Sequence, residues 1–313
     1  MDKIKLVAVV GPTASGKTAL GVEIAKEFNG EVVSADSMQI YKGLDIATAK
    51  PTEEEMQGIP HHLVGILDRD VSFSVADYVE LAKKSIEDIA SRGKLPVLVG
   101  GTGLYISSLL DGIVFPDIKS DENVRKRIQK EIDELGAEAV FEKLKAADPE
   151  TAAELHPNNK VRVIRALEVY ELTGRKLSEY KAESRKYPSP YDAVIIGIGA
   201  YDRSKLYDRI NMRVDKMLEN GLIDEAKEVF LAGGMKTSAN AIGYKELIPY
   251  FENKSDLNTC IEKIKQETRR YAKRQLTWFR KNAKIQWIML EELDNREKIH
   301  DYCRKIIAKQ ITL

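Results

Sequence analysis

The chain has 313 residues, enough for one large domain or two smaller ones, and its 43% hydrophobic and 31% charged residues are typical of a folded soluble protein. Lys plus Arg and Asp plus Glu number 49 each, so a site for a polyanion has to come from local asymmetry of charge. The two cysteines stand in no motif and no apolar run could span a bilayer, so we expect a cytoplasmic protein without disulfides, structural zinc or membrane contact.

The first third of the chain alternates strands with helices. Buried apolar runs predict strands, and apolar residues recurring on one face predict helices. In chain order we expect a strand over Lys3–Val10, a helix over Thr18–Phe28, a strand over Glu31–Ala35, a helix over Ser74–Arg92 and a strand over Leu95–Gly101. This order predicts an α/β fold with a parallel sheet flanked by helices, in which ligands bind at the carboxyl ends of the strands. Three segments follow strands in this way and should converge in one crevice: Gly11–Thr18, Asp36–Gln39 and Gly100–Tyr105.

The middle of the chain has a different character. Residues 119–186 are charged, have helical periodicity and lack strand signals, and the apolar run Ala193–Ala200 then restores the sheet pattern. We therefore predict an α/β core made of residues 1–116 and 190–313, interrupted by an all-helical insertion at residues 117–189. Long helices over Asp202–Leu231 and Leu257–Asn282 and a last strand over Lys284–Leu290 complete the core.

The segment GPTASGKT has the pattern of a P-loop, which usually binds ATP or GTP. It lies between a predicted strand and a predicted helix, as the motif requires. Backbone N–H groups and a helix N-terminus would hold phosphates, Lys17 would add a full charge, and the Thr18 hydroxyl could bind Mg²⁺. The candidate residues for binding phosphate are Gly11, Pro12, Thr13, Ala14, Ser15, Gly16, Lys17 and Thr18.

The machinery of a nucleotide hydrolase is incomplete. No carboxylate follows the strand Leu95–Val99, where a hydrolase would place a ligand for Mg²⁺. The tetrapeptide NKSD at 253–256 matches a guanine-reading motif, but Pro249 interrupts the apolar run before it, so we interpret it as a surface loop. Asp36 does follow a strand, and its position alone suits a general base and a helix N-cap equally. Thr102 and Tyr105, in GGTGLY, are similarly ambiguous.

Six motifs in order are more specific than any one of them. GPTASGKT, SADSMQIYKGLDIATAKP, PHHLVGILD, LVGGTGLY, AIGYKEL and TRRYAKRQLTWFR span residues 11–280. Together they resemble the tRNA isopentenyltransferase (dimethylallyltransferase) family in its bacterial form, because no Cys/His zinc pattern follows the core. The resemblance implies a P-loop NTPase-like fold and transfer of a dimethylallyl group from dimethylallyl diphosphate. The acceptor would be the exocyclic amine of the adenine directly 3′ of the anticodon, in tRNAs that read codons beginning with U.

The resemblance also implies roles for individual residues. The P-loop would hold the diphosphate of the donor, Asp36 would be the general base, Thr102 would contact the reacting nucleotide and Arg203 would help to hold the diphosphate. Ser37, Met38 and Gln39 match the segment that lines the adenine pocket. Mg²⁺ is the implied cofactor, and the tRNA anticodon arm and dimethylallyl diphosphate are the implied partners of a monomeric enzyme. Contacts of the insertion with tRNA are implied for Arg125, Val161, Arg162, Val163, Ile164 and Arg165.

The local charge asymmetry lies near the C-terminus. Residues 266–284 contain seven Lys or Arg residues against Glu267 alone. As a helix, this stretch would place Ala272, Leu276, Phe279 and Ala283 in the core, and Arg270, Arg274 and Lys281 on a face suited to RNA phosphates. An ordinary solvated helix face is the alternative.

Three other functions remain open. A small-molecule or nucleotide kinase would share the loop and the sheet, but would not need GGTGLY or the basic helix. An adenylate isopentenyltransferase would prenylate free nucleotides, although the insertion and the basic helix favour tRNA. A non-enzymatic RNA-binding module would leave the P-loop and Asp36 without a role.

Overall fold

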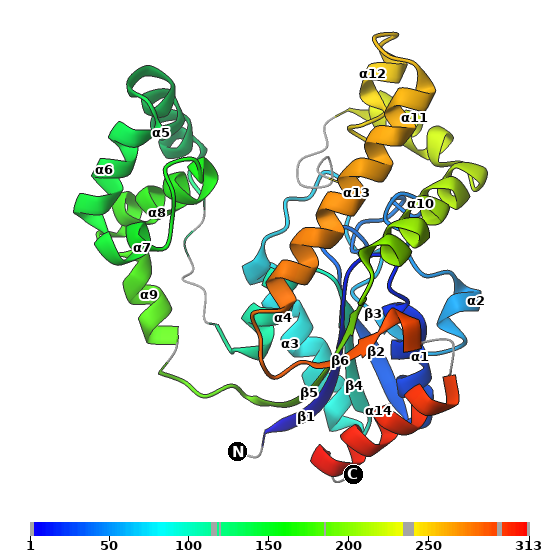
Figure 1. Ribbon diagram of the computed structural model, residues 1–313. Coiled ribbons are helices and arrows are strands. Elements are labelled where there is room, and N and C mark those ends of the chain that lie inside the picture. The colour runs from blue at the N-terminus through cyan, green and yellow to red at the C-terminus, as the bar shows by residue number, and fades with distance from the viewer. Residues whose placement is uncertain are drawn as a thin grey trace. The chain divides into compact units, whose positions relative to one another are not determined.

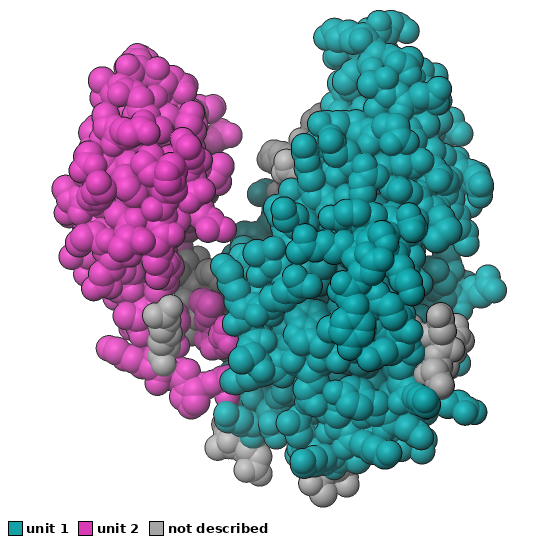
Figure 2. Space-filling view, viewed as in Figure 1, with its two compact units in different colours: residues 1–110, 190–313 teal, residues 111–189 magenta. Residues whose placement is uncertain are grey.

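The computed structural model describes residues 3–113, 118, 120–184, 186–233, 241–292 and 296–311. The predicted boundary at residue 116 lies outside these residues. The chain divides into two compact units, Met1–Leu110 with Pro190–Leu313 and Asp111–Ser189, which Figure 2 shows in two colours. The first is an α/β unit and the second is a helical insertion.

Among the described residues, the α/β unit contains one parallel sheet of six strands in the order β3-β2-β4-β1-β5-β6. The strands are β1 (Ile4–Val10), β2 (Gly30–Ala35), β3 (His61–His62), β4 (Leu95–Gly100), β5 (Tyr191–Gly199) and β6 (Gln286–Met289). The parallel α/β fold predicted from the sequence is confirmed, and the short edge strand β3 is the one strand that the apolar pattern did not indicate.

Helices cover both faces of this sheet (Figure 1). The described helices of this unit are α1 (Lys17–Glu27), α2 (Glu53–Met56), α3 (Val75–Ser91), α4 (Gly103–Leu110), α10 (Arg203–Glu219), α11 (Leu222–Ala232), α12 (Ile248–Phe251), α13 (Leu257–Phe279) and α14 (Arg296–Gln310), with a 3₁₀ turn at Leu290–Glu292. Of these, α1, α3 and α14 lie against the sheet, whereas α10–α13 extend beyond its end. The segment predicted to be helical over Asp202–Leu231 is broken at Gly221, which adopts the left-handed conformation (φ 96°) that favours glycine. NKSD lies between α12 and α13, and Asp256 caps α13 by accepting a hydrogen bond from the Thr259 N–H, so it is a loop as predicted.

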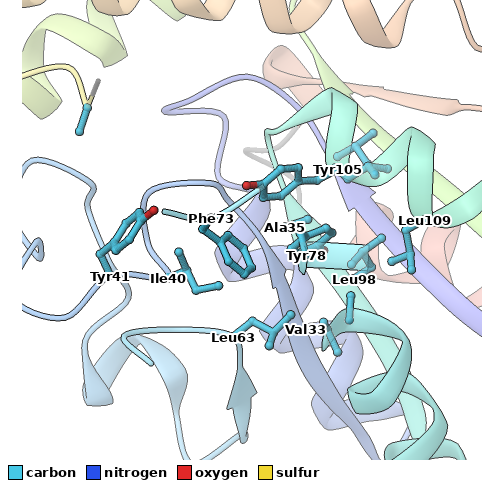
Figure 3. Close-up of a cluster of buried hydrophobic side chains, with 14 of the residues drawn as sticks. Val33, Ala35, Ile40, Tyr41, Leu63, Phe73, Tyr78, Leu98, Tyr105 and Leu109 are labelled. Carbon is cyan, nitrogen blue, oxygen red and sulfur yellow. The ribbon is translucent and has the colours of Figure 1, made fainter. Parts of the chain in front are cut away.

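Alternation along the buried strands determines which helices each face contacts. In β1, Val7 and Val9 pack with α1, whereas Leu6 and Ala8 pack in the cluster that contains residues of α3. The cluster on the α3 side includes Tyr78 and Tyr105, whose rings stack with centroids 4.2 Å apart (Figure 3). Tyr105, one of the ambiguous residues of GGTGLY, is therefore a core residue.

The insertion is all-helical in its described residues, as the sequence predicted. Its helices are α5 (Glu122–Leu135), α6 (Ala137–Ala147), α7 (Pro149–Ala153), α8 (Lys160–Thr173) and α9 (Leu177–Ser184). They enclose a separate apolar core that includes Ile128, Leu144 and Val163. Each unit thus has a core of its own.

Candidate functional site

The P-loop joins β1 to α1 and presents unpaired backbone donors. Ala14 and Gly16 have positive φ angles of 61° and 89°, which turn the chain tightly before α1 begins at Lys17. The N-cap residue of α1 is Gly16, which has no side chain to accept a hydrogen bond. The first N–H groups of the helix are therefore available to an anion. The Ser15 hydroxyl is fully buried in this loop without a hydrogen-bond partner.

Two cationic side chains, Lys17 and Arg209, donate hydrogen bonds to backbone carbonyls of the P-loop. The Lys17 ammonium donates to the Pro12 carbonyl at 3.3 Å, and Arg209 of α10 donates from Nε to the Ala14 carbonyl at 2.9 Å. Burial of the ammonium and the nearby charge of Arg213 lower the pKa of Lys17 to about 8, although Asp36 opposes this shift. Burial likewise lowers the pKa of Arg213, which the charge of Asp36 partly offsets.

Asp36 lies directly after β2, and one of its oxygens caps a turn. Oδ1 accepts the N–H groups of Met38 at 2.9 Å and Gln39 at 3.3 Å. Among the described residues, nothing donates a hydrogen bond to Oδ2. The two readings of Asp36 from sequence are therefore compatible, because one oxygen caps the turn while the other remains available for chemistry.

The turn after β2 is tied to the turn after β4. Thr102 Oγ1 accepts the Ser37 N–H at 3.0 Å, and the Thr102 N–H donates to the Ala35 carbonyl at 3.1 Å. The Gln39 side-chain amide donates to the carbonyls of Thr48 and Ala49 at 3.2 and 3.0 Å. Gln39 therefore holds the segment after β2 in place, and its amide N–H groups already donate to backbone carbonyls of the protein.

A small pocket opens between these segments. Its polar lining includes Lys17, Thr18, Asp36 and Gln39, and its apolar lining is Val32, Pro51, Val64 and Val99. His61, from the edge strand β3, also lines it and donates from Nδ1 to the Ile59 carbonyl at 2.8 Å. Charged groups thus adjoin an apolar wall, as a ligand with an anionic head and a hydrocarbon tail requires.

The structure brings together the predicted residues of the P-loop, Asp36 and Thr102, but not Arg203. Arg203 is exposed at the start of α10 and lines a different pocket with Lys273 and Arg280. Arg209 and Arg213, six and ten residues further along α10 than Arg203, are the arginines whose contacts or charges reach the P-loop and its lysine. The i, i+4 spacing of these two arginines was visible in the sequence, but their target was not.

Two further residues of α13 lie beside the site. Tyr271 is a residue that the sequence suggests for stacking on bases, and Gln275 is one that the sequence did not indicate. Burial, with the charge of Asp36 nearby, raises the pKa of Tyr271 above its usual value, whereas Thr102 and Gln275 oppose that rise. Gln275 is buried and bonds to Thr13 and Gly101. Positions 271 and 275 are one turn apart on one helix face, and only the packing of α13 beside the loops distinguishes them from ordinary core positions.

Two predicted tRNA contacts in the insertion are core residues instead. Val163 and Ile164 are 1% and 8% exposed, because the helical period of α8 turns them inward. Their side chains face the core, so a contact with RNA at these two positions would have to use the backbone. Val161 is 82% exposed and Arg162 is also exposed.

Arg125 and Arg165, the other two residues of the insertion that were predicted to contact tRNA, both pair with one buried carboxylate. Glu168 accepts hydrogen bonds from Arg165 Nη1 at 2.7 Å and Arg125 Nε at 3.0 Å. Burial opposes ionisation of Glu168, but these and other hydrogen bonds lower its pKa. The two arginines remain half-buried or exposed, so their remaining N–H groups can still reach a phosphate.

The basic helix α13 differs from its prediction at its C-terminal end. Ala272, Leu276 and Phe279 are buried as predicted, and Arg270 and Arg274 are exposed. The helix ends at Phe279, however, so the exposed Ala283 does not join the apolar stripe and Lys281 lies beyond the helical face. Arg270 also pairs with Glu267 at 2.7 Å.

Comparison with known proteins agrees with this geometry. The sequence model of the family described as IPP transferase matches residues 39–282. The chain belongs to the IPP transferase family. It is 47% identical to the tRNA dimethylallyltransferase of Thermoanaerobacter sp., over 98% of this chain and 99% of the relative, and 50% identical to that of Acetivibrio thermocellus, over 96% and 95%.

Solved structures show the same relationship. The full-length tRNA isopentenylpyrophosphate transferase from Bacillus halodurans is 46% identical over 98% of each chain, with a TM-score of 0.73. A eukaryotic dimethylallyltransferase acting on tRNA is 31% identical over 93% of this chain and 75% of its own, with a TM-score of 0.81. The P-loop-like α/β fold of this IPP transferase family member is thus shared across both relatives.

Proposed function

We propose that this protein transfers a dimethylallyl group from dimethylallyl diphosphate to the exocyclic amine of an adenine in tRNA. The adenine is the one directly 3′ of the anticodon in tRNAs that read codons beginning with U, and diphosphate is released. The observation that carries the proposal is the pocket in which Lys17 and Asp36 adjoin an apolar wall. Relatives named tRNA dimethylallyltransferase, matched along nearly the whole chain, support the same reaction.

The residues of the pocket suit both halves of this reaction. As the donor's C–O bond breaks, Lys17, Arg213 and the N–H groups at the start of α1 would stabilise the negative charge on diphosphate. As the C–N bond forms, the free oxygen of Asp36 would accept the proton of the adenine amine. The adenine has to leave its stack to reach Asp36, so the bound tRNA should have this base flipped out.

The donor set of the pocket suits Mg²⁺. Thr18 and Asp36 supply a hydroxyl and a carboxylate, which are hard oxygen ligands. Among the described residues there is no group of three or more His, Cys, Asp or Glu side chains that could hold a metal ion alone. This fits an ion bound mainly through the phosphates of a substrate, and such an ion would neutralise charge on the diphosphate.

Each unit carries exposed basic residues suited to the tRNA backbone. In the insertion these include Arg125 and Arg162, and on α13 they include Arg270 and Arg274. No helix of the described chain is long and apolar enough to cross a membrane. We further propose a cytoplasmic monomer, and the buried free thiols of Cys260 and Cys303 are compatible with a reducing compartment.

A labelling experiment tests the proposed reaction against its alternatives. The protein is incubated with dimethylallyl diphosphate labelled in its prenyl group, Mg²⁺, and either unmodified tRNA or AMP. In a separate incubation, ATP labelled in its γ-phosphate replaces the prenyl donor. Label in the tRNA base is the expected result. Label in AMP alone would indicate an adenylate isopentenyltransferase, and a phosphorylated product formed from labelled ATP would indicate a kinase.

A further inference from the structure

Gln275 of α13 connects two loops that are far apart in the sequence. Its Oε1 accepts the Thr13 N–H of the P-loop at 2.9 Å, and its Nε2 donates to the Gly101 carbonyl after β4, also at 2.9 Å. The side chain is 5% exposed, so neither bond competes with bulk water. One amide thereby satisfies a backbone donor of the P-loop and a backbone acceptor of the neighbouring loop.

The backbone next to this amide packs closely against α13. A Cβ atom at Gly101 would lie 2.2 Å from Gln275 Nε2, and a Cβ atom at Gly103 would lie 2.4 Å from the Trp278 ring. Trp278 in turn donates from Nε1 to the Ser107 hydroxyl of α4 at 2.9 Å. The backbone after β4 therefore approaches α13 closely, and the position of Gln275 is fixed from both sides.

These contacts have a consequence for anion binding. The Thr13 N–H is bonded to Gln275, so it is not one of the donors that face a phosphate. The donors at the start of α1 depend on how Thr13 is held, because Ala14 and Gly16 turn the chain immediately after it. Gln275 would therefore act on the ligand through the loop, without contacting it.

We propose that Gln275 is a positioning residue for diphosphate binding, whose side-chain amide holds the P-loop against the turn at Gly101. The inference rests on the proposed function, because it takes a diphosphate as the ligand of the loop. It also assigns α13 two separate tasks. The face with Gln275 orders the donor loop, while the exposed Arg270 and Arg274 are directed to solvent.

Two substitutions at this position separate the proposal from a general packing effect. Gln275→Met keeps the length of the side chain but removes both hydrogen bonds. Gln275→Glu keeps an acceptor for the Thr13 N–H, and it regains a donor for the Gly101 carbonyl only when its carboxyl group is protonated. Gln286→Met is the matched control, because Gln286 is half-buried in the edge strand β6 and lines none of the described pockets.

The measured quantities are the affinity for inorganic diphosphate with Mg²⁺, the affinity for tRNA, and the melting temperature. We expect Gln275→Met to weaken diphosphate binding about tenfold at every pH, because both hydrogen bonds are lost but they act on the ligand only through the position of the P-loop, with tRNA affinity within about twofold of the unsubstituted protein. We expect the Gln275→Glu variant to bind diphosphate weakly at about pH 9. Its affinity relative to that of the unsubstituted protein should recover toward pH 6, since burial raises the pKa of a carboxyl group.

Two results would overturn the inference. One is diphosphate affinity in Gln275→Met equal to that of the Gln286→Met control. The other is a Gln275→Glu variant whose diphosphate affinity, relative to that of the unsubstituted protein, does not change with pH. This second measurement tests the inference even if Gln275→Met fails to fold. An unsubstituted protein that binds no diphosphate would instead remove the proposed function, so the two failures are distinguishable.

Discussion

Asp36 uses its two oxygens differently, and this division determines how it should be tested. Oδ1 holds the turn through Met38 and Gln39, so removal of the whole side chain would disturb the pocket as well as the chemistry. Asp36→Asn preserves an acceptor for the turn and removes the base. We expect turnover to fall about 10²- to 10⁴-fold, the usual contribution of a general base, while tRNA affinity stays nearly constant.

Single-turnover kinetics and a filter-binding measurement of tRNA affinity check this expectation for Asp36. Asp68→Asn is the control, because Asp68 is an exposed carboxylate whose partner is Lys42. Unchanged single-turnover rates in Asp36→Asn would rule out the general-base role.

Lys17 makes diphosphate binding dependent on pH. Its pKa of about 8 lies below the usual value for lysine because the ammonium is buried near Arg213. Only the charged ammonium attracts an anion, so binding should be strongest below pH 8 and should weaken as the pH rises through that value. Because a bound anion raises the pKa of Lys17, the midpoint in the complex should lie higher than in the free protein.

Titration calorimetry with inorganic diphosphate between about pH 7 and pH 10 measures the effect of Lys17. Lys17→Met should bind weakly, and it should lack the part of the pH dependence that this ammonium causes. Lys26→Met, in the last turn of the same helix, should behave like the unsubstituted protein. An identical pH profile in Lys17→Met and the unsubstituted protein would contradict the assignment.

The sequence identifies residues whose position follows from local order, and it misses those brought in by packing. Lys17 and Asp36 could be predicted because each follows a strand, and the ends of parallel strands share one edge. Arg213 and Gln275 could not, because their roles depend on how α10 and α13 pack beside the loops. Ile164 shows the converse, since a family match at a position does not show which way its side chain points, and this side chain points into the core.

Among the elements of the insertion, α7 and α9 are joined by one buried carboxylate. Asp148 caps α7 by accepting from the N–H and hydroxyl of Thr151, and it also accepts from the N–H and hydroxyl of Ser178 on α9. Burial opposes ionisation, yet these four hydrogen bonds outweigh it and lower the pKa of Asp148. The ionised group therefore stabilises both helices at neutral pH.

We expect Asp148→Ala to destabilise the insertion by about 3 kcal/mol, since it removes a helix cap and leaves buried donors unpaired. Hydrogen exchange of the amides in α7 and α9 measures this locally. Glu150→Ala, an exposed substitution in the same helix, should leave exchange unchanged. Equal protection in both variants would mean that the apolar core alone holds these helices.

Glu31 is the corresponding link at the edge of the sheet. Its buried carboxylate in β2 accepts from Arg92 after α3, from Lys94 and from His62 of β3. The hydrogen bond from Arg92 lowers its pKa well below the usual range, burial opposes this shift, and Lys94 and His62 reinforce it. The folded-state pKa is depressed, so this stabilisation is complete above the unfolded-state value near 4.5 and is lost as the pH falls.

Glu31→Gln should therefore lower the free energy of unfolding by roughly 2 kcal/mol at pH 7, and this deficit should shrink as the pH falls below about 4.5. Urea unfolding at several pH values measures the difference. Glu80→Gln removes an exposed ion pair with Lys84 and should cost almost nothing. A deficit independent of pH would show that the charge of Glu31 does not supply the stabilisation.

At the scale of the whole molecule, a net charge of zero conceals an uneven distribution. Ion pairs with Glu168 and Glu267 neutralise part of the charge of Arg125, Arg165 and Arg270. Arg162 and Arg274 are exposed, and no ion pair to either occurs among the described residues. Composition alone thus excluded a strong global field, but only the folded chain distinguishes arginines that have a carboxylate partner from Arg162 and Arg274, which have none among the described residues.

The salt dependence of tRNA binding tests this distribution directly. Each phosphate neutralised by the protein should contribute about 0.7–0.9 to the slope of log affinity against log salt concentration, because binding releases condensed counterions. Arg162→Ala and Arg274→Ala should each reduce the slope by about one such contribution. Lys130→Ala, at an exposed position paired with Glu134, is the control and should leave the slope unchanged. If the affinity of the unsubstituted protein for tRNA did not vary with salt, neither the insertion nor α13 could bind the RNA backbone through charge, and recognition would have to depend on the flipped base alone.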